Sequence, residues 1–265
     1  MYDSSNRRIH YLRLSITDRC NLRCTYCMPA EGAMIVPHAS LLTYEEIVQL
    51  VQAGIALGID KVRITGGEPL LRRNVVDLVA ALARLPGLHD LAMTTNACRL
   101  PDFAVPLKQA GLHRLNISLD TLDPTQFAAI TRGGNLQEVL DGIAAAIAAG
   151  FQPIKLNCVI TASPDEPDAR AVAAFGAARG LPVRFIRRMN TAQGRFWQVI
   201  GGDGGHCATC NRLRVSSDGR IFPCLFNNTS YAVRELGATA ALLAAVQNKP
   251  TAGTASANRF HHLGG

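Results

Sequence analysis

The chain has 265 residues, of which 48% are hydrophobic, and a formal net charge of +7. This length accommodates one large α/β domain with an appendage, and the lack of a long apolar run or an apolar N-terminal segment predicts a cytoplasmic protein with neither a membrane span nor a signal peptide. The charge favours an anionic ligand or a solvated basic surface, but without an RNA-binding signature or a Lys/Arg block it does not indicate a nucleic-acid partner.

The first predicted strand, 11–17, leads directly into three cysteines, Cys20, Cys24 and Cys27. Their C-x3-C-x2-C spacing supplies three thiolates, one fewer than the four that normally hold a [4Fe–4S] cluster. A cluster held in this way keeps one iron open for a small molecule. Zinc sites usually combine pairs of ligands, and disulfide frameworks do not favour a tight triplet. The spacing therefore predicts an iron–sulfur cluster with a reactive iron.

Short β-rich runs then alternate with helical patterns as far as residue 189. Helices are predicted after Thr43, which forms a capping-box signature with Glu46, and at 135–149 and 166–178. Six strand–helix units imply a parallel sheet, and they fall short of the eight of a full barrel. We therefore predict a partial, open (β/α)6 TIM-like barrel rather than a doubly wound sheet. The predicted strands are 11–17, 61–65, 90–95, 114–119, 153–160 and 183–189.

The pattern changes after Met189, which divides the chain into a predicted core, 1–189, and a C-terminal region, 190–265. Residues 190–205 are rich in glycine and polar residues and indicate a loop or join. An alanine-rich helix is predicted around 238–246. The polar tail that follows is expected to be frayed unless the active site uses it.

A second cysteine group, Cys207, Cys210 and Cys224, lies in the C-terminal region. Six of the eight cysteines thus fall into two triplets, which suits metal ligation in a reducing compartment. With His206 the second group has the ligand types of a zinc site. Beside the first triplet, a second iron–sulfur cluster is the preferred interpretation. The isolated Cys98 and Cys158 are predicted to be buried small residues.

Several segments carry a resemblance to a known family. The first triplet, with Tyr26 before its last cysteine, and the Thr-Gly-Gly-Glu-Pro run at 65–69 resemble the radical S-adenosylmethionine (SAM) superfamily. Residues 13–20, 63–72, 116–120 and 207–214, with the terminal Gly-Gly, resemble the GTP 3′,8-cyclases (MoaA family), lyases that open molybdenum cofactor biosynthesis. The resemblance covers almost the whole chain. It implies two [4Fe–4S] clusters and SAM as cofactors.

The chemistry that this resemblance implies begins with SAM on the open iron of the first cluster. Its reductive cleavage gives a 5′-deoxyadenosyl radical that removes the ribose 3′ hydrogen of GTP, and the resulting carbon radical attacks C8 of guanine. The product is (8S)-3′,8-cyclo-7,8-dihydroguanosine 5′-triphosphate. The implied partners are a reductant such as flavodoxin and a downstream cyclic pyranopterin monophosphate synthase, and the family is often homodimeric.

The resemblance also assigns the site residues, and arginine forks and a lysine suit the phosphates of GTP. An arginine that points into a barrel is costly unless an anion meets it. The first cluster is assigned to Cys20, Cys24 and Cys27, and the second to Cys207, Cys210 and Cys224. SAM contacts are assigned to Tyr26, Gly67, Ser118 and Met189. GTP contacts are assigned to Arg13, Arg63, Thr94, Lys155, Arg212, Leu213 and Arg214. Catalytic roles are assigned to Arg212, Arg214, Gly264 and Gly265.

Three features depart from the family pattern. The join between Met189 and Cys207 is several dozen residues shorter, Arg187 stands where the family usually has an acidic residue, and Ala97 stands where it usually has glycine. Two alternatives therefore stay open. One is another radical SAM enzyme with an auxiliary cluster, and the other is an inactive, deletion-carrying paralogue with a binding or scaffold role.

Overall fold

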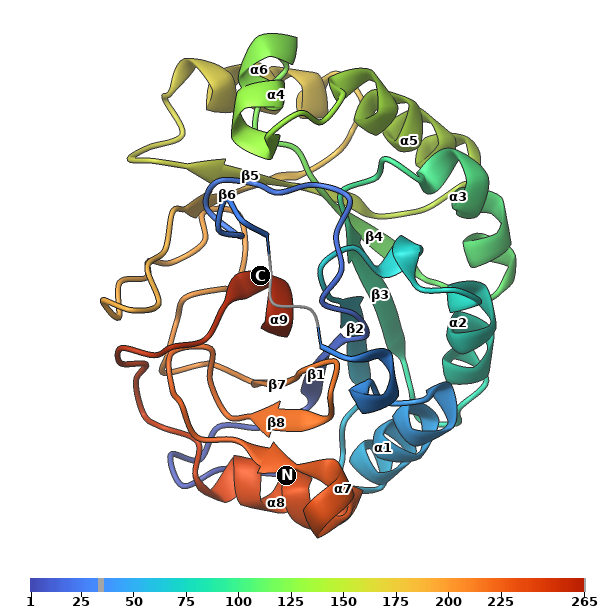
Figure 1. Ribbon diagram of the computed structural model, residues 1–265, viewed down its shortest axis with the longest axis vertical. Helices are drawn as coiled ribbons and strands as arrows, with labels where there is room; N and C mark the ends of the chain where they lie inside the picture. The colour runs from blue at the N-terminus through green and yellow to red at the C-terminus, as the bar shows by residue number, and fades with distance from the viewer. Residues whose placement is uncertain (33–35, 265) are drawn as a thin grey trace.

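The computed structural model describes residues 1–32 and 36–264. Its strands form one nine-stranded sheet in the order β6-β5-β4-β3-β2-β1-β7-β8-β9. The sheet curves around a central space and leaves its two edges unjoined, with most of the helices on the outside (Figure 1). This is the predicted partial TIM-like barrel. The strands are β1 (Tyr11–Ser15), β2 (Lys61–Thr65), β3 (Asp90–Thr95), β4 (Arg114–Ser118), β5 (Ile154–Ile160), β6 (Val183–Arg187), β7 (Arg212–Val215), β8 (Arg220–Phe222) and β9 (Tyr231–Ala232).

Two of the long helices begin at strong capping residues. Thr43 and Glu46 form the predicted capping box at the start of α1 (Tyr44–Ala56). The side chain of Asn135 caps α5 (Leu136–Ala148) and accepts a hydrogen bond from the backbone amide of Gln137. None of the described helices has the length and apolar character needed to cross a bilayer. The helices are η1 (His38–Ser40), α1 (Tyr44–Ala56), η2 (Pro69–Leu71), α2 (Val75–Ala83), α3 (Leu100–Gln109), α4 (Pro124–Thr131), α5 (Leu136–Ala148), α6 (Pro167–Ala177), α7 (Val233–Leu236), α8 (Ala238–Gln247) and α9 (Phe260–Leu263).

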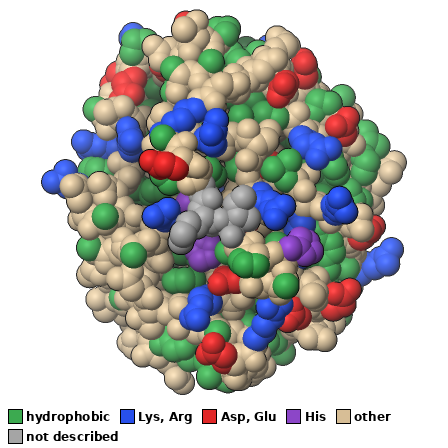
Figure 2. Space-filling model, in the orientation of Figure 1, with side chains coloured by type: hydrophobic (Ala, Val, Ile, Leu, Met, Phe, Trp, Pro, Cys, Tyr) green, Lys and Arg blue, Asp and Glu red, His purple; other side chains and the backbone are tan. Residues whose placement is uncertain are grey.

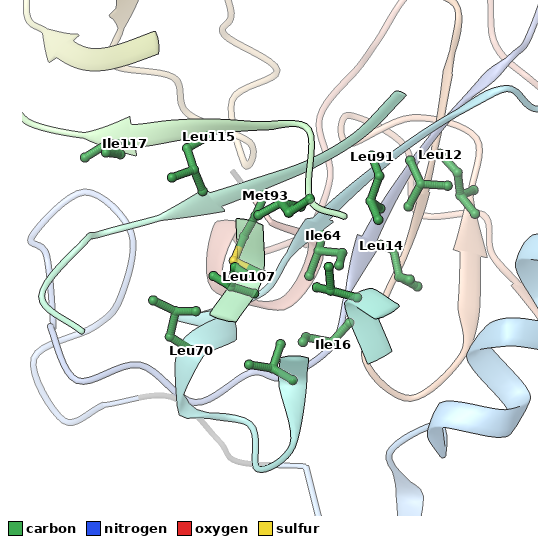
Figure 3. Packing of buried hydrophobic residues seen from close by; sticks show 14 of the residues in the cluster. Leu12, Leu14, Ile16, Ile64, Leu70, Leu91, Met93, Leu107, Leu115 and Ile117 are labelled. Atoms are coloured by element: carbon green, nitrogen blue, oxygen red, sulfur yellow. The ribbon is translucent and has the colours of Figure 1, made fainter. Parts of the chain in front are cut away.

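One large apolar core fills the space between the sheet and the outer helices (Figure 3). On β1, Leu12 and Leu14 belong to this core, whereas Tyr11 and Arg13 line a cavity inside the barrel. Successive residues of a strand point to opposite faces, so each strand feeds both the core and the interior. Full burial of a leucine contributes about 1.5–3 kcal/mol. The apolar face therefore holds the barrel together and leaves the interior face free for polar side chains.

The six predicted strands are confirmed to within two residues at each end. The C-terminal region adds what the sequence pattern did not show, because β7 pairs in parallel with β1 and continues the barrel sheet. Antiparallel β8 and β9 then extend it further. The second cysteine group is thereby attached to the edge of the barrel through backbone hydrogen bonds. Strands from both sides of the predicted boundary at residue 189 thus belong to one sheet, and the division into two regions stays a prediction.

The short join after β6 folds back onto that strand. Phe185 and Ile200 exchange two backbone hydrogen bonds of 3.0 Å, and Asn190 pairs with Arg195 around a turn at Gly194. Arg187 lies over the Trp197 ring, 4.3 Å from its centroid. A cation above an indole face is attractive. The join thus covers the free edge of β6 and brings Trp197 to the barrel interior.

Ala97 adopts a backbone conformation that favours glycine, with φ of 67° and a fully buried side chain. The left-handed region costs an alanine about 1–2 kcal/mol, whereas glycine's extra chain entropy costs about 0.5–1 kcal/mol. We therefore expect Ala97→Gly to raise the free energy of unfolding by roughly 0.5–1 kcal/mol. Urea denaturation at an unchanged m-value measures the difference. A loss of stability would mean that packing of the methyl group outweighs the strain.

Candidate active site inside the barrel

Two neighbouring cavities lie inside the barrel. The first, of about 180 Å³, is lined by the first cysteine triplet, and the second, of about 190 Å³, by the second triplet and a group of basic side chains. Asn157, Ile186 and Met189 line both cavities. A group bound in one cavity would therefore lie next to a group bound in the other.

The loop of the first triplet is docked on the end of α4. The backbone amides of Arg23 and Thr25 donate to the carbonyls of Thr131 and Ile130, at 3.1 and 2.9 Å. Arg132 then donates from one Nη1 to the carbonyls of Arg23 and Met28, at 2.7 and 2.8 Å. These bonds fix the backbone on both sides of Cys24 and Cys27. Arg132 was missed in the sequence, because nothing local distinguishes it from a surface arginine.

Gly66 and Gly67 bring the end of β2 against the start of the cysteine loop. A Cβ at Gly66 would lie 2.4 Å from the Thr17 carbonyl oxygen, and one at Gly67 would lie 2.3 Å from that of Arg19. The amides of Gly67 and Glu68 donate to these same carbonyls, each at 2.8 Å. Only residues without a Cβ permit this approach. The predicted role of the glycine pair, close backbone approach at a strand end, agrees with this geometry.

Glu68 ties the end of β2 to the end of β3. Its fully buried carboxylate accepts from the amides of Leu70 and Asn96 and from the Thr95 hydroxyl, at 3.0, 2.7 and 2.8 Å. Burial raises the pKa of Glu68 to about 7 against the opposing effect of these bonds. Asn96 in turn donates to Asn21 at 2.8 Å, beside Cys20. Sequence reasoning recognised Glu68 only as part of a motif and did not find this bracing role.

All four residues assigned to SAM line the first cavity, namely Tyr26, Gly67, Ser118 and Met189. The Tyr26 hydroxyl donates to Asp120 at 2.6 Å, and the other oxygen of that carboxylate accepts from the Val159 amide at 2.8 Å. Burial raises the pKa of Asp120 to about 6. These bonds hold the Tyr26 ring beside the triplet. The contact of these residues with SAM stays a prediction.

The thiols of the first triplet stand around the cavity wall. Burial is the largest influence on them and raises the pKa of Cys20 to about 11 and of Cys24 and Cys27 to about 12. A thiolate forms here only where a cation stabilises it, as the iron of a cluster does. Across residues 1–32 and 36–264, no three His, Cys, Asp or Glu side chains lie close enough to hold a single metal ion. Three cysteines that line one cavity are the donor set of an iron–sulfur cluster, so the residues present fit such a group.

The second cavity contains a row of basic side chains in register across the sheet. Arg214 on β7, Arg13 on β1 and Arg63 on β2 are direct neighbours. Ala92 and then Arg114 continue the row on β3 and β4. Parallel strands in this register place the side chains at one level of the interior. Arg214, Arg13 and Arg63 from this row form part of the lining of the second cavity.

The lining of the second cavity has an excess of positive charge. The Nε atoms of Arg63, Arg184 and Arg212 are buried and have no hydrogen-bond partner among the described residues. Burial lowers the pKa of Arg214 to about 10 and also lowers that of Arg13, with the neighbouring Arg214 as the next cause. Buried donors without acceptors cost free energy unless a ligand supplies acceptors. The cavity therefore fits a multiply charged anion.

The residues assigned to GTP do not all reach this cavity with their side chains. Arg13, Arg63, Arg212 and Arg214 line it. Thr94 lines the first cavity, and Lys155 lies in register with Asn116 near the basic group without lining either cavity. Leu213 is fully buried and belongs to the outer core, so its side chain points away from the interior. Arg184, Tyr11, Lys61 and Lys249 line the second cavity and were not named from the sequence.

The second triplet lies in a basic environment. Cys207, Cys210 and Cys224 line the second cavity together with Lys249. Burial by itself raises the pKa of Cys210, but the charges of Lys249 and Arg212 outweigh it, so the net shift is downward. The thiolate form of Cys210 is therefore easier to reach than that of the cysteines in the first triplet.

The C-terminal tail enters the barrel instead of fraying at the surface. Figure 1 shows α9 within the ring of strands. Arg214 donates to the carbonyls of Leu263 and Gly264, and Gly264 lies against the Thr65 side chain and lines the first cavity. His261 contacts the Cys27 carbonyl at 3.2 Å. Gly265 lies outside the described residues. On the face drawn in Figure 2, Lys, Arg and His side chains lie around the middle of the ring.

The chain matches known proteins over most of its length. The model of the radical SAM superfamily matches residues 14–175. A Geobacter sulfurreducens protein named GTP 3′,8-cyclase is 41% identical over 279 residues, covering 88% of this chain and 86% of that protein. One of the same name from Pseudomonas putida is 39% identical over 283 residues, covering 89% and 84%. Both alignments are longer than this chain, so the relatives carry residues that it lacks.

Solved structures share the fold at lower identity. Streptococcus suis SuiB aligns with a TM-score of 0.59 and 15% identity, over 87% of this chain and 65% of that one. Methylornithine synthase (PylB) aligns with a TM-score of 0.56 and 17% identity, over 69% and 54%. At these identities the similarity shows the fold alone.

Proposed function

Because the chain belongs to the GTP 3′,8-cyclase family of the radical SAM superfamily, we propose that it converts GTP to (8S)-3′,8-cyclo-7,8-dihydroguanosine 5′-triphosphate. This is a lyase reaction of molybdenum cofactor biosynthesis. The observation that carries the proposal is the pair of adjoining cavities, one built around a cysteine triplet and the other around buried arginines. A radical source and an anionic substrate need such adjacency, because effective reaction requires the reacting atoms in near contact.

The first cavity would hold the cluster and SAM. Cys20, Cys24 and Cys27 would ligate the cluster, and with SAM bound this site supplies a radical that can remove a ribose hydrogen. Tyr26 is held in place by Asp120 and closes the cavity beside the triplet. The glycine pair lets the end of β2 lie against the backbone that leads into the triplet, because a Cβ at either position would meet a backbone carbonyl oxygen.

The second cavity would hold GTP. Arg13, Arg63, Arg212 and Arg214 present guanidinium groups that can bind triphosphate oxygens bidentately. Cys207, Cys210 and Cys224 would hold a second cluster whose open iron binds the guanine edge. Fixed at both ends, the nucleotide would turn its ribose toward Met189 and the first cavity. We further propose a catalytic role for the terminal doublet Gly264 and Gly265, which would help GTP reach the radical.

The same proposal implies an electron donor, a downstream enzyme, a cellular location and an oligomeric state. Radical SAM chemistry consumes one electron per SAM cleaved, so a reductant such as flavodoxin is needed. The product would pass to a cyclic pyranopterin monophosphate synthase. We also propose a cytoplasmic location and a homodimer. Clusters with an open iron are exposed to oxidants, so the enzyme should be handled without oxygen.

Anaerobic reconstitution followed by product analysis tests the function. We expect about eight irons per chain, SAM cleavage that depends on GTP, and formation of the cyclised nucleotide. SAM cleavage that is indifferent to GTP would identify another radical SAM enzyme. No cleavage at all would identify an inactive paralogue. About four irons per chain would contradict the second cluster.

A further inference from the structure

A buried lysine joins two segments of the second triplet. Lys249 follows α8 and is 3% exposed. Its Nζ donates to the carbonyl of Arg212 at 2.8 Å and to that of Pro223 at 2.6 Å. Arg212 lies two residues after Cys210, and Pro223 lies immediately before Cys224. One ammonium group thus connects the two backbone segments that carry these cysteines.

A buried arginine connects the remaining cysteine. Arg7 is 7% exposed and donates to the Cys207 carbonyl at 2.8 Å and to the Pro250 carbonyl at 2.7 Å. Its Nε forms a 2.6 Å ion pair with Asp3, whose side chain is fully buried. Pro250 directly follows Lys249. The segment after α8 is therefore attached to all three cysteines, through Lys249 on one side and Arg7 on the other.

The charge of Lys249 has no carboxylate partner within salt-bridge distance among the described residues. A buried ammonium is costly unless negative charge lies nearby. The groups able to supply that charge are the thiolates of Cys210 and Cys224, which act on Lys249 electrostatically. A cluster bound through these thiolates would place its negative charge where the lysine needs it.

We propose that Lys249 and Arg7 are positioning residues that assemble the second three-cysteine site and balance its charge. The inference rests on the proposed function, since it takes the second triplet to hold a cluster. Lys249 fixes the Cys210 and Cys224 segments and sets the local potential. Arg7 fixes the Cys207 segment from the N-terminal side.

The test isolates the second site. In the full-length variant Cys20→Ala/Cys24→Ala/Cys27→Ala, only the second triplet can bind iron, and we expect about four irons per chain after anaerobic reconstitution. Adding Lys249→Met should speed loss of this iron to a chelator about 10- to 100-fold, the range for partners that support metal ligands. It should also shift the midpoint potential of the remaining cluster to more negative values, because a positive charge is removed. Lys249→Arg, which keeps the charge, should largely restore the potential.

Two controls keep the outcomes separate. Lys108→Met removes an exposed lysine and should change neither the rate of iron loss nor the potential. With the first triplet intact, Lys249→Met should bind SAM and should retain about four irons after the chelator has removed iron from the second triplet, which shows that the chain is folded. Normal iron retention and an unchanged midpoint potential in Lys249→Met would overturn this inference but not the proposed function. An iron-free triple cysteine variant with Lys249 intact would overturn the second cluster, and with it the proposed function.

Discussion

Gly67→Ala should leave the protein without iron at the first triplet and without measurable SAM binding. The new Cβ would lie 2.3 Å from the carbonyl oxygen of Arg19 and 2.6 Å from its carbonyl carbon. Both are backbone atoms, so the segment leading into Cys20 must move as a whole. Overpacking of this kind costs about 1–3 kcal/mol of stability. A displacement near 1 Å is enough to reduce a rate about 100-fold, so SAM cleavage should fall at least that far.

Gly150→Ala is the matched control for this variant. Gly150 has φ of 75°, so alanine is strained there by about 1–2 kcal/mol, but nothing lies within 4 Å of the new Cβ. It should lose stability and keep its iron. Iron per chain, SAM binding by equilibrium dialysis and urea denaturation compare the two variants. Equal iron contents would show that the glycine pair is dispensable for the first site.

Much of the barrel could be predicted because its signals are local. β-Branched and apolar runs such as the one on β2, bounded by glycine or polar residues, fix the strand positions, and the cysteine spacing predicts metal ligation. The glycine pair was interpretable because a strand end leaves few other reasons for two adjacent glycines. The family resemblance assigned Arg13 and Arg63 to an anionic ligand, and both side chains line the second cavity.

The rest depends on contacts between distant parts of the chain. Arg7 and Cys207 are 200 residues apart, and no local pattern joins them. Lys249 follows an ordinary alanine-rich helix, and its burial becomes visible only when β7 is placed beside β1. Arg184 was overlooked because β6 sits at the sheet edge, where an arginine usually faces solvent. Leu213 shows the reverse case, since its neighbours in the motif face the cavity while its own side chain faces the core.

Arg63→Met should stabilise the free protein and weaken GTP binding. Arg63 is 8% exposed, its Nε has no partner among the described residues, and its pKa is lowered by burial. Replacing a buried charge of this kind with an apolar side chain of similar length should raise the free energy of unfolding by on the order of 1–3 kcal/mol. Loss of hydrogen bonds to a charged group costs about 1.5–3 kcal/mol, so the Kd for GTP should rise about 10- to 150-fold.

Arg114→Met provides the contrast within the same row of the sheet. Arg114 forms two hydrogen bonds of 2.7 Å with the carboxylate of Asp90, so its charge is already paired. Its removal leaves Asp90 with only Lys61, at 3.1 Å. We expect this variant to lose about 1 kcal/mol or more of stability while the Kd for GTP changes little. Opposite effects from two arginines in one register row would separate ligand-binding charge from structural charge.

The decisive measurement is thermal unfolding of wild type and Arg63→Met with and without GTP. At a GTP concentration of 100 times its own Kd, the wild type gains about 2.7 kcal/mol of stability. If the variant binds about 100-fold more weakly, the same concentration equals its Kd and adds only about 0.4 kcal/mol. Since the free variant starts out more stable, its advantage shrinks or reverses as GTP is added. If Arg63 were purely structural, its replacement would lower stability at every GTP concentration. If it were a solvated surface residue, its replacement would change neither the stability nor the Kd for GTP. Only a buried cation held for an anionic ligand makes the order of stability depend on that ligand.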